Sequence, residues 1–212
     1  MFPHFVKALE QKLRAPLPGF EAYKVMMPHL RNPERYKLQD KSKARNGGVL
    51  ILLYLDEGKI MLPLMKRPEY DGVHGGQVSF PGGKKETGDK DLIETALREA
   101  NEEIGVDISK VTVIGTLSKF YLSASNFNVL PVVGFVDGKP NFVPEPVEVE
   151  QILETELKHL QKAATKKETE LLIRNTYKLK TPYFDVQGHV VWGATAMMLS
   201  ELLAVVEEID FR

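Results

Sequence analysis

The chain has 212 residues, of which 43% are hydrophobic and 27% are charged, so its composition excludes disordered, fibrous and low-complexity proteins. Its 28 basic and 29 acidic residues give a formal net charge of -1, which excludes a global basic field of the kind that holds a nucleic-acid backbone. The chain contains no cysteine, which excludes disulfides, thiolate metal sites and a cysteine nucleophile.

Apolar side chains near the N-terminus recur at the spacing of one helix face: Phe2, Phe5, Val6, Leu9 and Leu13. They predict a short amphipathic helix that ends in the stretch 15–19, which contains prolines and a glycine. We expect its apolar face to pack on the main domain or on a second subunit. Residues 31–45 are mostly basic and polar without apolar periodicity, which favours a solvated linker over a phosphate-binding arm. We therefore divide the chain into an N-terminal extension and linker, residues 1–45, and a domain, residues 46–212.

The first half of the domain alternates between apolar stretches and turns. Residues 49–55 and 59–65 are apolar and flank Asp56-Glu57-Gly58, a pattern that predicts a β-hairpin. Residues 89–104, which follow a glycine-rich stretch, have helical character and precede Gly105, a residue type that often ends helices.

The second half of the domain begins with two predicted strands, residues 111–117 and 129–136. Residues 144–162 then carry two patterns. Val147 and Val149 alternate as in a strand, whereas the following apolar residues suit a helix: Ile152, Leu153, Leu157 and Leu160. We expect a strand that turns into a helix.

A C-terminal amphipathic helix completes the predicted elements. Its apolar face recurs every three or four positions: Trp192, Thr195, Met198, Leu199, Leu202, Leu203 and Val206. Strands interleaved with two substantial helices predict an α/β fold layered around a mixed sheet.

The most informative segment joins a glycine pair to a helix that carries three glutamates. On a helical wheel, Glu99, Glu102 and Glu103 fall within an arc of about 100°, separate from the apolar arc of the same helix. Because like charges at these spacings repel one another, the cluster predicts a compensating cation. Carboxylate oxygens suit Mg²⁺ or Mn²⁺ as ligands. Taken alone, the pair Glu102 and Glu103 is better explained as a solvated acidic face.

The wider motif changes that interpretation. Arg98-Glu99-x-x-Glu102-Glu103-x-Gly105-Val106, preceded by Gly82-Gly83, closely resembles the Nudix box. Upstream, Arg67, Gly76 and Phe80-Pro81-Gly82-Gly83 resemble the coenzyme A pyrophosphatase branch of that family. Together with later segments, the resemblance covers roughly residues 46–206.

Two positions depart from the family pattern. Gly72 stands where the branch usually has a second arginine, and the spacing from Gly83 to Arg98 is one residue longer than usual, with Asp89 in place of a glutamate. The extra residue precedes the carboxylate face, so we expect metal binding to survive it.

The resemblance implies a Nudix α/β/α sandwich that hydrolyses a diphosphate linked to another moiety with a divalent metal, Mg²⁺ or Mn²⁺. It implies that Glu99 and Glu103 are metal ligands and that Glu102 is a ligand or a base that orients water. It also implies that Arg98 orients the glutamates, although an ordinary surface ion pair would use the same residue.

Other candidate site residues flank this motif. Lys66 and Arg67 would clamp phosphate oxygens, although solvated cations at a strand end fit the pattern nearly as well. The backbone at Gly82 and Gly83 can approach a metal or phosphate because no Cβ intervenes. The resemblance implies that Glu148 completes the metal site or supplies a base, and an exposed acidic turn fits it equally.

Two more segments are better explained without chemistry. His74 fits a hydrogen-bonding role in its loop better than a catalytic one. Trp192-Gly193-Ala194 fits close packing of the last helix on the sheet, and the resemblance leaves a substrate contact open.

The leading functional hypothesis is hydrolysis of coenzyme A or its thioesters to adenosine 3′,5′-bisphosphate and an (acyl-)4′-phosphopantetheine. One alternative is hydrolysis of another nucleoside diphosphate derivative, such as a nucleotide sugar or dinucleotide, which Gly72 keeps open. A second is a noncatalytic Nudix-like sensor of nucleotides, against which the intact Arg98 and three glutamates argue.

The expected partner is therefore a small molecule, with no nucleic acid and no membrane, and a homodimer stays open. The longest apolar run, residues 49–55, is far shorter than the roughly 20 residues that cross a bilayer. The first residues show no signal-peptide pattern, so we expect a cytoplasmic protein.

Overall fold

The structure, a computed structural model of the chain, describes residues 2–29, 43–69, 75–123, 125–173, 177–207 and 209. Eight of the described strands form a mixed sheet: β1 Arg45–Asp56, β2 Lys59–Lys66, β3 Val78–Ser79, β4 Gly82–Lys84, β5 Thr112–Thr116, β6 Phe120–Leu122, β7 Phe127–Phe135 and β8 Gln151–Glu156. The other three described strands form a smaller antiparallel sheet: β9 Lys166–Ile173, β10 Tyr177–Val186 and β11 His189–Trp192.

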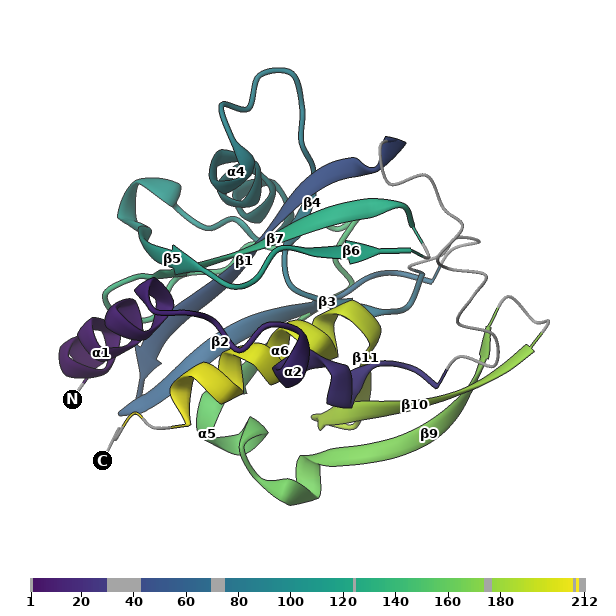
Figure 1. Cartoon of the computed structure of the whole chain (residues 1–212). Coiled ribbons are helices and arrows are strands. Elements are labelled where there is room, and N and C mark those ends of the chain that lie inside the picture. Colours follow the sequence, from purple (N-terminus) through teal and green to yellow (C-terminus); the bar gives the residue numbers. More distant parts are fainter. Residues whose placement is uncertain are drawn as a thin grey trace.

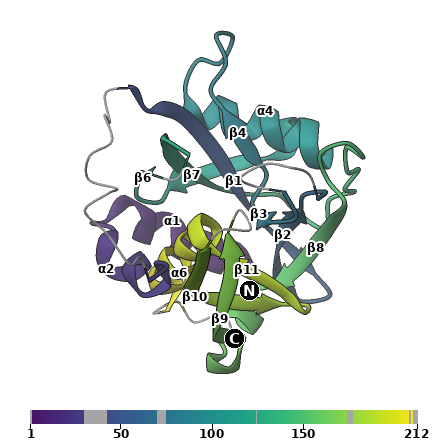
Figure 2. The same ribbon diagram turned by 90° about the vertical axis from the view of Figure 1, so that its right-hand side faces the viewer.

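Helices lie on both sides of the larger sheet. α4 (Leu92–Ile104) covers one face, whereas α1 (Phe2–Arg14) and α6 (Gly193–Val206) pack on the other (Figure 1). The smaller sheet lies on the far side of α6 from β1 (Figure 2). The remaining helical segments are short: α2 Phe20–Tyr23, η1 Lys24–Met26, η3 Ile108–Lys110, α5 Leu157–Leu160 and η4 Ala163–Thr165. The predicted α/β/α arrangement around a mixed sheet is confirmed.

The central strand β1 separates two apolar cores. It pairs in parallel with β7 and antiparallel with β2 and β4. Because side chains alternate along a strand, Leu50 and Leu52 pack with α4, while Ile51 and Leu53 pack with α1 and α6. All four are fully buried. One core therefore holds α4 against its face of the sheet, and the other holds α1 and α6 against the opposite face.

Several predicted elements occur with small changes at their ends. β1 and β2 form the predicted hairpin, and Glu57 and Gly58 occupy its turn with φ of 46° and 76°, as tight hairpin turns require. β5 and β7 match the strands predicted over residues 111–117 and 129–136. α4 and α6 match the two substantial helices.

The N-terminal helix packs on the domain. All five apolar residues predicted for its inner face are buried in the same core as α6: Phe2, Phe5, Val6, Leu9 and Leu13. Farther along, the Ser200 hydroxyl donates to the Ala22 carbonyl at 2.7 Å, and the Glu201 carboxylate accepts the Gly19 N–H at 3.0 Å. The predicted packing is confirmed, whereas the division of the chain at residue 45 stays a prediction, since residues 30–42 lie outside the described ones.

The prediction for residues 144–162 is partly wrong. Ile152 and Leu153 belong to β8 and not to a helix, because they pair with Met65 and Leu64 of β2. Val147 precedes this strand in a turn and is 80% exposed. Only α5 of the expected helix exists, so pairing with a neighbouring strand overrides the helical spacing.

The smaller sheet was not predicted. β9 is the edge strand of this sheet, and most of its side chains are exposed or partly exposed. It therefore lacks the clean apolar alternation that predicts a strand. Within the described segments, no helix is long and apolar enough to span a membrane.

Candidate active site

The helix that carries the three glutamates has defined ends. The Asp91 side chain accepts hydrogen bonds from the backbone N–H groups of Ile93 and Glu94, both at 2.9 Å, which satisfies donors that a helix start leaves unpaired. Gly105 ends α4 in the left-handed conformation with φ of 69°. These caps fix the register in which the glutamates face the glycine pair.

Arg98 is the centre of an ion-pair network and not a solvated surface residue. Its Nε lies 2.9 Å from Asp89 Oδ1, its Nη2 lies 3.0 Å from Glu99 Oε1, and its Nη1 lies 2.8 Å from Glu102 Oε2. The Arg98 guanidinium holds the pKa of Asp89 well below its usual range. Arg98 therefore fixes two of the three glutamates, and its part in catalysis stays a prediction.

Glu103 is the buried member of the cluster, with a side chain that is 2% exposed. Arg67 Nη2 lies 2.6 Å from its Oε1, and the Gly82 N–H donates to its Oε2 at 2.7 Å. Burial raises the pKa of Glu103 to about 7, although Arg67 and the Gly82 N–H both act to lower it. A charged Glu103 is thus costly in the free protein.

The glycine pair forms a cradle for Glu99. A Cβ on Gly83 would lie 2.5 Å from Glu99 Oε1, so another residue there would displace the carboxylate. Gly82 has φ of 153°, a conformation that favours glycine, and a Cβ there would meet the Gly48 carbonyl oxygen at 2.5 Å. Burial raises the pKa of Glu99, and the charges of Glu102 and Glu148 act in the same direction against Arg98.

Of the two predicted clamps, only Arg67 contacts a glutamate of α4. Its Nη1 also lies 3.8 Å from Glu148 Oε2, so its guanidinium lies between Glu103 and Glu148. Lys66 instead pairs with Glu150 at 2.6 Å. Because consecutive residues of a strand point to opposite faces, the two cations take different partners.

The donor set fits a hard divalent cation. Glu99, Glu102 and Glu103 offer only oxygen ligands, and the Gly83 cradle leaves room at Glu99. The charge of Glu102 acts to raise the pKa of Glu99, and the charge of Glu99 acts to raise the pKa of Glu103. In the described part of the chain, no three acidic or histidine side chains converge as a metal site, because the carboxylates turn toward arginines and Gly82. Mg²⁺ or Mn²⁺ would compete with these arginines for the same oxygens.

Comparisons with known proteins agree with this geometry. Residues 44–175 match the family model of the NUDIX domain. The chain belongs to the Nudix family. It is 37% identical over 176 residues to Nudix hydrolase 15, mitochondrial, of Arabidopsis thaliana, an alignment that covers 80% of this chain and 61% of the relative. The chain thus spans about three fifths of the length of that relative.

Two further matches concern function and fold. The mitochondrial coenzyme A diphosphatase NUDT8 of Mus musculus is 34% identical over 161 residues, covering 74% of this chain and 76% of the relative. The crystal structure of the Nudix hydrolase RenU of M. smegmatis matches with a TM-score of 0.52 at 15% identity, covering 78% of this chain and 88% of that chain. The structural match shows the fold alone.

These findings support the prediction of a Nudix hydrolase. Both sequence relatives are named as mitochondrial proteins, so the cytoplasmic location stays a prediction.

Asp89 is part of the ion-pair network of Arg98, although the sequence pattern predicts no role for it. It is buried and paired with Arg98, nine positions later, because the loop before α4 folds back; sequence spacing does not reveal such a contact. Gly72 and His74 lie outside the described residues. Ala194 packs against the main core, as expected from close packing of α6.

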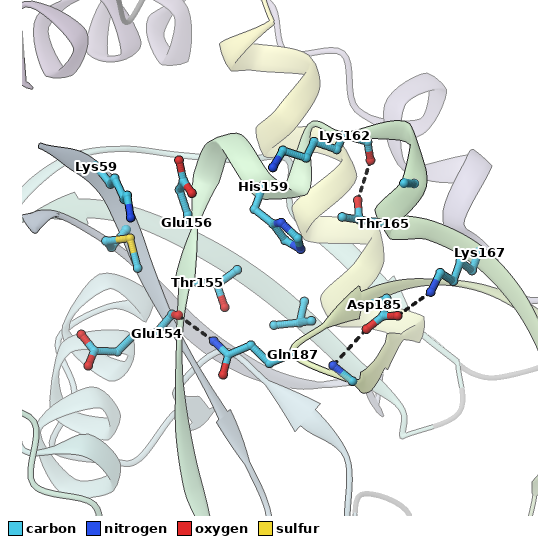
Figure 3. Close-up of a pocket in the computed structure, with 14 residues that line it drawn as sticks. Lys59, Glu154, Thr155, Glu156, His159, Lys162, Thr165, Lys167, Asp185 and Gln187 are labelled. Carbon is cyan, nitrogen blue, oxygen red and sulfur yellow. Dashed lines mark hydrogen bonds and ion pairs between the residues drawn. The ribbon is translucent and has the colours of Figure 1, made fainter. Parts of the chain in front are cut away.

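A separate pocket of about 540 Å³ lies at the opposite end of β2 (Figure 3). Three of its charged side chains, those of Glu154, Lys167 and Asp185, form ion pairs within the protein. Lys167 Nζ lies 2.6 Å from Asp185 Oδ2, and Gln187 Nε2 donates to the Glu154 carbonyl at 2.8 Å. The described residues that line this pocket include none of the predicted site residues, so the candidate active site lies at α4.

Proposed function

We propose that this chain is a metal-dependent pyrophosphohydrolase that cleaves the diphosphate of coenzyme A or an acyl-coenzyme A. The products are adenosine 3′,5′-bisphosphate and (acyl-)4′-phosphopantetheine. One observation carries the proposal: Glu99 and Glu103 lie against Gly82 and Gly83 with the Arg67 guanidinium beside them. This arrangement offers oxygen ligands for a cation and a planar donor for phosphate within one small site.

The residues of the chain have distinct parts in this reaction. When bound, Mg²⁺ or Mn²⁺ supplies Lewis-acid stabilisation of the negative charge on the diphosphate. Arg67 donates to phosphate oxygens in the two-pronged geometry that suits guanidinium groups. Arg98 holds Glu99 and Glu102 in fixed orientations through its bonds of 3.0 Å and 2.8 Å.

Two further carboxylates, Glu102 and Glu148, have parts in activating the water and in binding the cation. Glu102, whose side chain is 56% exposed, is accessible to the attacking water and accepts its proton or orients it. Glu148 lies 3.8 Å from Arg67 and completes the set of acidic groups from the opposite side. Water adds to phosphorus, the P–O bond of the diphosphate breaks, and one product keeps the new oxygen.

Coenzyme A is the proposed substrate for two reasons. Residues 67–83 resemble the coenzyme A pyrophosphatase branch, and the chain is 34% identical to a relative named as a coenzyme A diphosphatase. Gly72, in place of the usual second arginine, favours the other candidate, which is hydrolysis of a different nucleoside diphosphate derivative.

A substrate panel with Mg²⁺ and with Mn²⁺, read by product mass, tests the proposal. We expect coenzyme A to give its two products in equal amounts, with oxygen from ¹⁸O-labelled water on only one of them. Exhaustive chelation should abolish the reaction. Rapid loss of a nucleotide sugar or dinucleotide while coenzyme A survives would overturn the substrate, and full activity after chelation would overturn the mechanism.

A further inference from the structure

The short strand β3 contains a hydroxyl group whose role the proposed reaction does not yet explain. Within the described residues, Ser79 Oγ is shielded from solvent and has no hydrogen-bond partner. Buried hydroxyl groups nearly always find a partner, because an unpaired one loses its hydration without compensation. An exception next to a candidate site indicates that the partner arrives with a ligand.

The neighbouring residue on β3 shows the usual arrangement. The carbonyl of Val78 accepts a hydrogen bond from the buried Thr195 hydroxyl of α6 at 3.1 Å. On the side of α6, the fold therefore supplies a partner for this carbonyl of β3. The Ser79 hydroxyl, unlike the Val78 carbonyl, has no hydrogen-bond partner among the described residues.

Strand register places Ser79 on the face of the candidate site. Ser79 pairs with Met65 of β2, which packs in the core beneath α4. Arg67 continues β2 on the same face and donates its N–H to the Gln77 carbonyl. Ser79 and Arg67 are thus diagonal neighbours, a relation that places two residues about 7–8 Å apart, with their Cβ atoms somewhat closer.

Ser79 is also close in sequence to Gly82, the second residue that holds the Glu103 carboxylate. Three residues after Ser79, the Gly82 N–H donates to Glu103 Oε2 at 2.7 Å, while Arg67 binds Glu103 Oε1 at 2.6 Å. A diphosphate that draws Arg67 away from Glu103 changes the surroundings of the Ser79 hydroxyl.

We propose that Ser79 is a substrate-contact residue whose hydroxyl donates to a diphosphate oxygen held by Arg67. The inference rests on the proposed function and adds to it a specific donor. It assigns the unpaired hydroxyl a partner that is absent from the free protein. Removing the hydroxyl should therefore affect ligand binding and not folding.

Ser79→Ala tests the proposal, with Thr195→Val as the matched control on the other contact of β3. Binding is measured by calorimetry with methylenediphosphonate and Mg²⁺, and stability by urea unfolding of the free protein. We expect Ser79→Ala to weaken binding about tenfold or more, as for a lost hydrogen bond to a charged group, and to leave stability unchanged or increased. Its KM for the hydrolysed substrate should rise by the same factor with little change in kcat.

Thr195→Val should do the opposite, because it leaves the Val78 carbonyl unpaired. We expect lower stability and unchanged diphosphonate binding. Equal binding by the wild type and Ser79→Ala would overturn the role of Ser79 while the proposed function stands. Destabilisation of Ser79→Ala to the level of Thr195→Val would also overturn it, since the hydroxyl would have a partner in the free protein. A wild type that binds no diphosphonate would overturn both proposals.

Discussion

The two ends of β2 carry their charged side chains in different ways. Beyond Lys66, four glutamates, in addition to Asp89, gather around only two guanidinium groups, those of Arg67 and Arg98: Glu99, Glu102, Glu103 and Glu148. One of the four is almost fully buried, and burial raises the pKa of two of them.

At the Lys59 end, three acidic groups pair with lysines near the surface: Asp56, Glu154 and Asp185. Lys139 Nζ lies 2.9 Å from Asp56 Oδ2 and 3.0 Å from Glu154 Oε2, and Lys167 pairs with Asp185. Figure 3 shows the Lys167 pair beside the pocket.

The two ends therefore differ in the balance of charge, because carboxylates outnumber their cations beyond Lys66 and ion pairs with lysines lie near the surface at the Lys59 end. Burying carboxylates with too few cations opposes folding, whereas exposed ion pairs change stability little. An excess of carboxylates that opposes folding, kept at one end of β2, indicates a functional site at that end.

Glu103→Gln should give the largest effect. The substitution keeps the size of the side chain and removes one charge from the proposed metal site, so we expect kcat to fall about 10²–10³-fold, or about 2.7–4 kcal/mol. Steady-state turnover with Mg²⁺ measures it. Glu94→Gln, on the exposed first turn of the same helix, is the matched control and should retain turnover. Near-native turnover by a folded Glu103→Gln protein would contradict the assignment.

The pH dependence of stability in metal-free protein should come next in size. The pKa of Glu103 is about 7 in the folded chain, against an ordinary value of 4.5, so the folded state binds the extra proton between these values. Stability should therefore fall as pH rises from 4.5 to 7, by about 3 kcal/mol for this group. Urea unfolding in the presence of a chelator measures the slope.

Two comparisons sharpen the pH prediction. Glu103→Gln should lose this part of the slope, because its side chain binds no proton in this range. Mg²⁺ should restore stability near pH 7, since it favours the charged carboxylates. Identical slopes in the wild type and the variant would show that other groups determine the pH dependence.

Asp89→Asn should have an intermediate effect on stability. It removes the negative charge that Arg98 contacts through two nitrogens, and we expect a loss of about 1.5–3 kcal/mol. Chemical unfolding measures the loss, and Asp137→Asn at an exposed position is the control. An unchanged stability would mean that Glu99 and Glu102 alone suffice to hold Arg98.

The sequence predicts best where local patterns and the folded structure agree. The helix with its three glutamates is visible from periodicity and from Gly105, and the structure has it as α4. The contacts that turn this helix into a site come from elsewhere in the chain. Arg67 reaches Glu103 because β2 ends beside α4, and helical spacing contains no such information.

The errors have a common physical origin in strand pairing. Ile152 and Leu153 fit a helix by spacing but pair with β2, and the charged edge strand β9 shows no apolar alternation. Lys66 and Arg67 look equivalent in the sequence, yet they take different partners, and only Arg67 joins the carboxylates. The alternation of side chains therefore decides which of the two adjacent cations contacts Glu103, whereas the role of either cation at phosphate stays a prediction.

The smallest effect should come from Lys167→Met at the distal pocket. The side chains of Lys167 and Asp185 are 48% and 29% exposed, so water solvates each partner when the pair is broken. Asp185 also keeps a hydrogen bond of 3.0 Å from the Gly188 N–H, which holds the turn without the lysine. We expect turnover, diphosphonate binding and the midpoint of urea unfolding to stay at wild-type values.

A loss of turnover as large as that of Glu103→Gln would place chemistry at the Lys59 end of β2. The difference in charge pairing between the two ends of β2 would then no longer identify the functional end.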